Sequence, residues 1–514
     1  MKIRLSRRNL ANRILNLPKR EPPFAHPGLI LIQIDGFSKT EFERALQKGE
    51  MPFIKSILDD KKHHLLTMFS GVPSVTPSVQ GELLFGVKTC VPSFNFFDRT
   101  AKQVMTMYDR DSASVIEKKL ELETKGLLAE GSSYCNILTG SAKEPHFCAA
   151  NWGVAGFFHG VNPLFLLCYI DQVIRSAVLV TIELCLSVFE CIRGTLTGWR
   201  FSKELELIWV RVLACILMRE VVTLGTCLDI ARCLPAIHLN FIGYDEQAHR
   251  RGPASSYAHW SLPGIDACIR KIFRAAGKAP REYSIWIFSD HGQHRTTPYP
   301  VLHQETLKET IVRILKKEIH LDTLKHRRKN RDSWMRRQDS IVGRFFKRPA
   351  HLTPDDLVVT DMGPEAHVYF PTPLNDSDLQ AMIEKLLHDT KVPLAMVPLK
   401  EGKVAAWTRA GRFVLPDQLS EIIGADHPFL PDITEDLMRV CHHPNAGDFI
   451  LSGWCKGQSP IAFPFENGSH GGMGVEETKA FVCLPKELAC NFSEKKYIRP
   501  IHLWELAQKI QDKK

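Results

Sequence analysis

Residues 282–291, EYSIWIFSDH, most constrain what this 514-residue chain can fold into. Residues 284–288 form a short run of apolar, β-branched and aromatic side chains, which is typical of a strand buried on both faces. The run stops at Asp290, His291 and Gly292. Polar residues directly after such a strand lie where open α/β sheets bind ligands, beyond the carboxyl ends of their strands. The stretch therefore predicts an α/β sheet with a polar site at one edge.

Two further apolar runs end in the same way. Gly28–Ile34 is followed directly by Asp35, in a context similar to that of Asp290. A third run, 236–241, leads to Asp245 and His249, which share one face if a helix begins there, so that both can reach a single ion. An Asp after a strand more commonly caps a turn. The repeated context favours metal binding over capping.

Thr76 lies in the segment GVPSVTPSVQGELLFG, residues 71–86, at the predicted start of a helix. It follows an extended Pro-containing piece and precedes Pro77, a residue tolerated in the first turn of a helix. A hydroxyl there meets backbone N–H groups and the positive end of the helix dipole, where a phosphate can bind. The alternative is an ordinary N-cap. Near the other end of the chain, His470 lies in the Gly-rich turn NGSHGG.

Residues 147–235 interrupt the α/β pattern. Two long apolar stretches, 163–192 and 205–234, have helical periodicity, and charged residues break both. Because a membrane span needs about 20 residues with few charges, we predict an inserted helical hairpin whose apolar face packs on the core or contacts a membrane or a partner. The other predicted parts are a basic N-terminal segment (1–27), an α/β core (28–146, 236–315 and 441–514), a basic segment (316–349) and a small α+β cap subdomain (350–440).

The distribution of charge and the cysteine pattern indicate the cellular compartment and the contact partners of the chain. The net charge of +9 is concentrated in residues 1–23, with seven Lys or Arg, and in 325–348, with ten. Both segments are either solvated faces or contacts with an anionic membrane surface, and no motif for nucleic-acid binding accompanies them. The 14 cysteines show no CxxC pair, and the N-terminus lacks the apolar core of a signal peptide. We expect a cytoplasmic protein, with membrane association left open.

The order of these motifs resembles that of the alkaline phosphatase superfamily, and most of all its type I phosphodiesterase/nucleotide pyrophosphatase family. The resemblance covers roughly residues 28–100, 236–300 and 445–485. It implies a central, mostly parallel sheet flanked by helices, to which the hairpin and the cap are additions. It also implies a two-zinc site that suits nitrogen and oxygen ligands, with seven predicted ligands: Asp245, His249 and His470 for one ion, and Asp35, Asp290, His291 and the Thr76 oxygen for the other.

The same resemblance implies a hydrolase of phosphodiester or pyrophosphate bonds, with Thr76 as nucleophile, a phospho-threonine intermediate and Asn95 holding a phosphate oxygen. The substrate would be a phosphate-ester small molecule or a lipid-linked phosphate. No Cys-x-Pro-x-Arg element stands at the nucleophile, which disfavours a sulfatase, and no matching arginine disfavours a monoesterase. A phosphomonoesterase, a phosphoryl transferase, manganese in place of zinc, and a non-catalytic membrane-surface or partner-binding protein remain alternatives.

Overall fold

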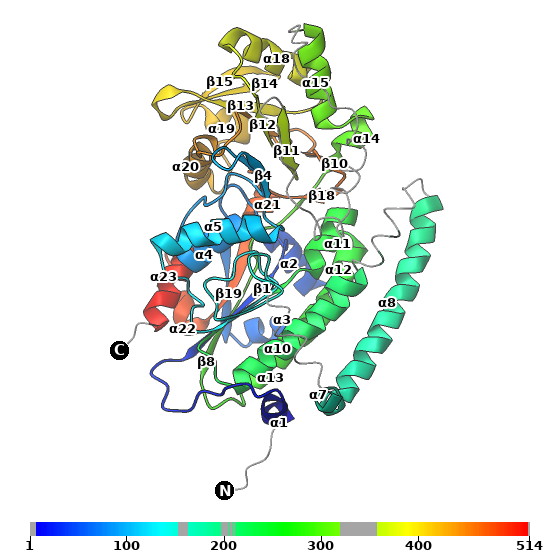
Figure 1. Ribbon diagram of the computed structural model, residues 1–514, viewed down its shortest axis with the longest axis vertical. Helices are drawn as coiled ribbons and strands as arrows, with labels where there is room; N and C mark the ends of the chain where they lie inside the picture. Colours follow the sequence, from blue (N-terminus) through cyan, green and yellow to red (C-terminus); the bar gives the residue numbers. More distant parts are fainter. Residues whose placement is uncertain are drawn as a thin grey trace.

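The computed structural model describes residues 7–152, 163–196, 205, 208, 211–318 and 357–511. Two sheets organise these residues, one in the lower half of Figure 1 and one in the upper half. The basic run at 325–348 lies outside the described residues.

The larger sheet has seven strands in the order β2-β19-β8-β1-β7-β5-β6. β8, β1, β7, β5 and β6 run parallel, and β19 is antiparallel to both β8 and β2. The predicted fold class, an α/β protein with a mostly parallel sheet and a separate smaller subdomain, is confirmed. The strands are β1 (Gly28–Ile34), β2 (His63–Phe69), β5 (Ser132–Tyr134), β6 (Glu144–His146), β7 (Ala236–Phe241), β8 (Tyr283–Phe288) and β19 (Lys479–Pro485).

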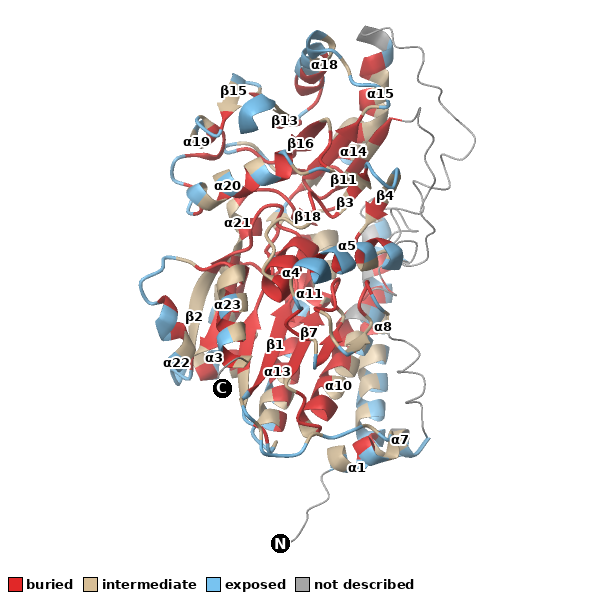
Figure 2. Ribbon diagram, turned by 60° about the vertical axis from the view of Figure 1, so that its left-hand side comes forward, coloured by how far each residue is buried: buried red, intermediate tan, exposed pale blue. Residues whose placement is uncertain are grey.

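Helices cover both faces of this sheet because its central strands are apolar on both sides. On β1, Leu29 and Leu31 face one hydrophobic cluster while Ile30 and Ile32 face the other, as the alternation of a strand requires. Figure 2 shows these strands buried along their length. One face carries α4 (Thr76–Phe85), α5 (Arg110–Glu123) and α23 (Pro500–Gln511), and the other carries α2 (Lys39–Gln47), α3 (Pro52–Asp59), α10 (Arg219–Ala231), α11 (Gly243–Arg251), α12 (Ser256–Trp260) and α13 (Leu262–Ala276).

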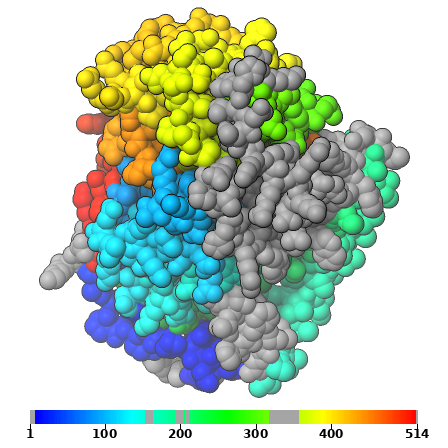
Figure 3. All heavy atoms as spheres, turned by 45° about the horizontal axis from the view of Figure 1, so that its top comes forward, coloured from blue at the N-terminus to red at the C-terminus, as the bar shows by residue number. Residues whose placement is uncertain are grey.

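The second sheet is antiparallel throughout, in the order β11-β12-β16-β13-β14-β15. In Figure 3 this subdomain, yellow to orange, caps the blue and cyan segments of the core. β16 (Phe449–Ser452) pairs with β12 and β13 here, so residues 441–514 do not belong wholly to the core, contrary to the predicted division. Other elements of this subdomain are β11 (Val358–Met362), β12 (Glu365–Tyr369), β13 (Leu394–Pro398), β14 (Val404–Thr408), β15 (Gly411–Leu415), α15 (Leu307–Glu318), α18 (Asp376–Asp389), α19 (Leu419–Ile423) and α20 (Leu430–Cys441).

The inserted segment contributes helices of two kinds. α10 packs against α13 and β7 and is part of a core layer, whereas α8 (Ile170–Leu196) lies along the edge of the molecule against η1 (Arg211–Met218). α8 is preceded by α7 (Pro163–Cys168), which contacts α1 (Arg7–Ile14). By length and composition alone, α8 qualifies as a candidate membrane span, a test that core helices of soluble proteins also pass.

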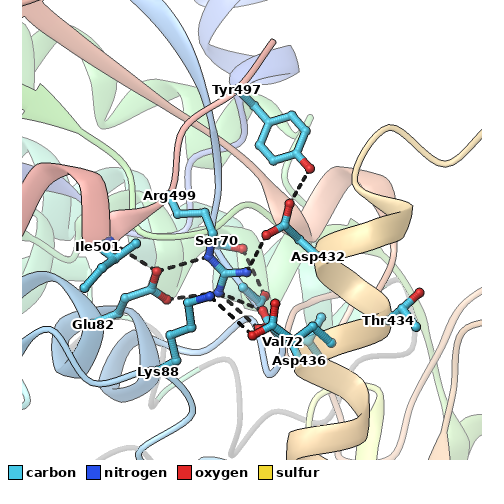
Figure 4. A network of polar contacts seen from close by, with 12 residues as sticks. Ser70, Val72, Glu82, Lys88, Asp432, Thr434, Asp436, Tyr497, Arg499 and Ile501 are labelled. Atoms are coloured by element: carbon cyan, nitrogen blue, oxygen red, sulfur yellow. Dashed lines mark hydrogen bonds and ion pairs between the residues drawn. The ribbon is translucent and has the colours of Figure 1, made fainter. Parts of the chain in front are cut away.

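A buried polar network joins the core to the second subdomain (Figure 4). The Arg499 guanidinium, 4% exposed, donates to Glu82 of α4 (3.1 Å) and to Asp436 of α20 (2.8 Å). It also reaches Asp432 of α20, which accepts a hydrogen bond from Tyr497. Because α4 begins at Thr76, this network fixes the helix that carries the predicted nucleophile.

Candidate metal centre

Three adjacent parallel strands deliver the three predicted aspartates. β8, β1 and β7 are neighbours in register, so their carboxyl ends meet at one edge of the sheet. Asp35 directly follows β1, Asp290 follows β8, and Asp245 lies in the first turn of α11 after β7. All three are at most 6% exposed. Carboxylates are almost never buried this deeply without a partner, so the cluster calls for a counter-charge.

Gly36 allows two of the aspartates, Asp35 and Asp245, to approach each other. Its φ is 66°, and a Cβ there would lie 2.0 Å from Oδ1 of Asp245. Gly292, which follows His291, has no positive φ. A Cβ on Gly292 would lie 2.1 Å from the carbonyl oxygen of Glu476, so close packing explains this glycine.

Thr76 is the first residue of α4, and Val75 is the N-cap. The hydroxyl is therefore not used as a cap, which was the alternative role open to it. Its Oγ1 lies 3.2 Å from Nε2 of His291, and the side chain is 7% exposed. The start of α4 thus places a hydroxyl group against the aspartate and histidine cluster.

All three predicted histidines are oriented by backbone carbonyl groups. Nδ1 of His291 lies 3.1 Å from the carbonyl oxygen of Gly292, and Nδ1 of His470 lies 2.8 Å from that of Ser74. Nδ1 of His249 lies 3.0 Å from the carbonyl oxygen of Gly468. A carbonyl can only accept, so the rings of His291 and His470 carry their proton on Nδ1 and leave the lone pair of Nε2 for a metal. This arrangement is common for histidines that bind metals. His249 differs: although burial alone would lower its pKa, the charges of Asp245 and Glu466 raise it well above the ordinary value, which favours protonation of both ring nitrogens.

The ligand atoms converge in two groups, each with all its atoms within 4.8 Å of one another. One group is Asp35, Asp290 and His291, and the other is Asp245, His291 and His470. Nε2 of His291 lies 3.3 Å from Asp290 and 3.6 Å from Asp35. His249 falls outside both groups, but its Nε2 lies 3.3 Å from Oδ2 of Asp245. The sequence assigned His291 to one ion, whereas the geometry places it between the two groups.

Burial sets the protonation of these side chains. It lowers the pKa of His291 to about 4 and that of His470 to about 3, so both rings are neutral near pH 7 and can coordinate a metal. Burial and then the charge of Asp245 raise the pKa of Asp290 to about 6. Burial, followed by repulsion from Asp290, raises the pKa of Asp35 well above its usual range. The carboxylates thus repel one another, which a bound cation would relieve.

The donor set fits divalent metal ions. Oδ2 of Asp290 is fully buried and accepts no hydrogen bond from the residues that the structure describes, as expected of an oxygen that is meant to coordinate an ion. Neutral imidazole nitrogens beside carboxylate oxygens are the ligands that zinc prefers. Fold and cluster together define an α/β protein with buried Asp and His metal-site candidates beside a threonine.

Asn95, the predicted phosphate-binding residue, opens β3 (Asn95–Asp98), which pairs with β4 (Gln103–Thr106). Its Nδ2 donates to the carbonyl oxygen of Asp361 in β11, at 3.0 Å, while its buried Oδ1 has no hydrogen-bond partner in the part of the chain that the structure describes. Within the described residues, no hydrogen bond joins it to the seven predicted ligands.

Sequence analysis missed a set of polar side chains that hold the ligands. Asn240 donates to Asp35 (2.5 Å), Gln293 donates to Asp245 (2.5 Å), and Glu466 lies 3.3 Å from Nδ1 of His249. Asn240 is a polar interruption in an apolar strand, which was a usable signal. Glu466 precedes the NGSHGG turn, and no pattern in the sequence distinguishes it from other acidic residues.

Comparisons with known proteins bear on the fold. No protein-family model matches the chain, and no curated protein matches it in sequence. Among solved structures, the chain is similar to murine ectonucleotide pyrophosphatase/phosphodiesterase 5, described as an inactive threonine-to-alanine variant in complex with AMP (10% identity, 94% of both chains, TM-score 0.49). A second structure of that murine protein gives a TM-score of 0.48 at the same identity and coverage.

The chain is also similar to phosphonoacetate hydrolase from Sinorhizobium meliloti in complex with phosphonoformate (12% identity, 96% of this chain and 97% of that chain, TM-score 0.46). The chemistry of the site rests on its own geometry.

Proposed function

We propose that this protein is a metal-dependent hydrolase that cleaves phosphodiester or pyrophosphate bonds through a phospho-threonine intermediate. One observation carries the proposal: Oγ1 of Thr76 lies 3.2 Å from Nε2 of His291, the ring shared by both groups of metal-ligating atoms. A hydroxyl on the first residue of a helix, free of capping and facing such a cluster, is placed for nucleophilic attack.

The seven predicted ligands would hold two zinc ions, which supply positive charge for the phosphoryl oxygens and lower the pKa of an attacking hydroxyl. The substrate phosphate lies at the N-terminus of α4, where the helix dipole favours an anion. Thr76 Oγ1 gives up its proton and forms a bond to phosphorus, while the bond to the leaving oxygen breaks and that oxygen takes up a proton, which releases an alcohol from a diester or a phosphate from a pyrophosphate bond. Water then attacks the phospho-threonine, the bond between Oγ1 and phosphorus breaks, Oγ1 regains a proton, and the phosphate-bearing product leaves.

A diester is favoured over a monoester by the charges around the cluster. Within the described residues, no Lys or Arg forms an ion pair with Asp35, Asp245 or Asp290. A phosphomonoester carries one more negative charge than a diester and would gain more from such a cation.

The test is turnover of bis-p-nitrophenyl phosphate against p-nitrophenyl phosphate, after chelation and again after zinc is added back. We expect turnover of the diester to exceed that of the monoester, to vanish on chelation and to return with zinc. Manganese added to a parallel sample identifies the preferred ion. A monoester preference would make the protein a phosphomonoesterase, and activity that survives complete chelation would contradict the two-metal proposal.

A further inference from the structure

α8 buries polar side chains and exposes apolar ones, which is the reverse of an ordinary surface helix. Its inward residues include Glu183 and Ser187, which are 2% and 3% exposed. Its outward residues are apolar, although a helix on a water-soluble surface normally buries its apolar side. In Figure 2 this helix, pale blue and tan, lies at the right-hand edge of the lower half of the molecule. The outward set, which we name the α8 stripe, is Ile174, Val178, Ile182, Leu186, Phe189 and Ile192, all at least 36% exposed.

Polar contacts fix the inward side of α8 to the body of the protein. Glu183 accepts a hydrogen bond from Nε of Arg211 in η1 at 2.6 Å, and both side chains are 3% exposed. Its other oxygen accepts from Nε1 of Trp260 in α12 at 3.2 Å. The Arg211 guanidinium also lies 5.0 Å from the ring centre of Tyr257. These contacts of the Glu183 carboxylate fix the rotation of α8 about its own axis, and the stripe therefore faces outward.

The two ends of the stripe indicate what covers it. Arg175 lies next to Ile174 at one end and Arg193 next to Ile192 at the other, and no exposed side chain described between these two arginines is charged. The N-terminal end of α8 also lies beside the basic α1, where Arg7 pairs with Asp171. An apolar strip with cations at its ends complements an apolar layer bordered by anionic headgroups.

We propose that the α8 stripe docks on an anionic lipid bilayer, with the helix lying in the plane of the membrane surface. The helix does not cross the bilayer in this arrangement, because its inward face is bonded to Arg211 and Trp260 of the protein body. A spanning orientation would carry that body into the hydrocarbon layer. In the plane of the surface, the stripe enters the acyl boundary while the two arginines reach the headgroups.

The cations at the ends of the stripe favour anionic lipid over a protein partner or a second copy of the chain as the occupant. Residues that dominate binding at interfaces between proteins are enriched in Trp, Tyr and Arg near the centre of the interface. The stripe has aliphatic side chains and one aromatic, Phe189, and its arginines stand at the ends.

Co-sedimentation with vesicles tests the proposal. The full chain should bind vesicles of phosphatidylcholine with phosphatidylserine. The variant Ile182→Glu/Phe189→Glu should bind the same vesicles with an affinity lower by roughly tenfold or more, because it places two charges in the acyl boundary. Leu122→Glu, on an 89% exposed leucine of α5, is the matched control and should bind as the unmodified chain does. Absence of vesicle binding, or equal binding of the double variant, would overturn the proposal. So would a dimer, detected by light scattering, that the double variant dissociates while vesicles bind neither protein.

A second readout leaves the stripe unchanged. Cys185 of α8 and Cys490, far along the chain, are both exposed thiols. An environment-sensitive fluorophore on Cys185, in a Cys490→Ser background, should shift to the blue when vesicles are added. The same fluorophore on Cys490, in a Cys185→Ser background, should not shift. Equal shifts at both positions, or none at Cys185, would contradict a bilayer at the α8 stripe.

Discussion

Replacing Thr76 by alanine is expected to lower turnover of a phosphodiester by about a thousandfold or more, because it removes the atom that attacks phosphorus. The helix should be unaffected, since Val75 provides the N-cap and the hydroxyl makes no capping bond. The measurement is the rate of p-nitrophenol release from bis-p-nitrophenyl phosphate at saturating zinc. Thr76→Ser keeps a hydroxyl on the same helix and should retain a measurable part of the activity.

Thr434→Ala is a matched control for that experiment. Its hydroxyl donates to the carbonyl oxygen of Leu430 within α20, away from the cluster, at 2.7 Å. We expect its turnover to stay within about twofold of the unmodified chain, as for most surface substitutions. If Thr76→Ala turned over the diester as fast as Thr434→Ala, the nucleophilic role of Thr76 would be wrong, even though its hydroxyl touches His291.

Replacing Arg499 by leucine is expected to lower the free energy of unfolding by about 3–5 kcal/mol, because it leaves buried carboxylates without a counter-charge. Glu82 and Asp436 are 3% and 0% exposed and would lose their cation (Figure 4). Burial already raises the pKa of Asp436 to about 6 with Arg499 present. Urea unfolding followed by tryptophan fluorescence measures the change.

Arg439→Leu is the control for Arg499. Arg439 pairs with Glu435 on the same helix, α20, but both side chains are about half exposed. Such a surface pair contributes roughly 0.5 kcal/mol or less. Equal losses for the two variants would mean that the Arg499 network does not hold α4 and α20 together. A larger loss for Arg499 supports its role between the core and the second subdomain.

The strands that carry the site could be predicted from the sequence because buried parallel strands are nearly continuous apolar runs. Gly28–Ile34 and Ala236–Phe241 match β1 and β7 residue for residue. What the pattern does not encode is the sheet that a strand joins. Residues 441–514 were assigned to the core, but β16 within them pairs with β12 and β13 in the second sheet. Pairing depends on distant partners, which a local apolar run does not specify.

The site shows the same limit at the level of single side chains. Asp35 and Asp290 directly follow strands, so their meeting point could be expected from the strand pattern alone. The position of His291 between both groups depends on how its ring is turned by the carbonyl of Gly292, which no spacing predicts. On α8, the sequence analysis treated charged residues as interruptions of an apolar stretch. Glu183 instead faces Arg211 inside the protein. Which side of the helix is buried depends on its rotation about its own axis, and the sequence pattern does not specify that rotation.

Zinc content per chain, measured by inductively coupled plasma mass spectrometry on protein purified without chelators, tests the central claim most directly. We predict about two zinc ions per chain, as a two-metal site requires. Asp245→Asn and Asp35→Asn should each reduce this to about one, because each aspartate belongs to a different group of ligand atoms. A content well below one per chain that zinc addition does not raise, or no loss in either variant, would contradict the convergence of these side chains on a metal pair.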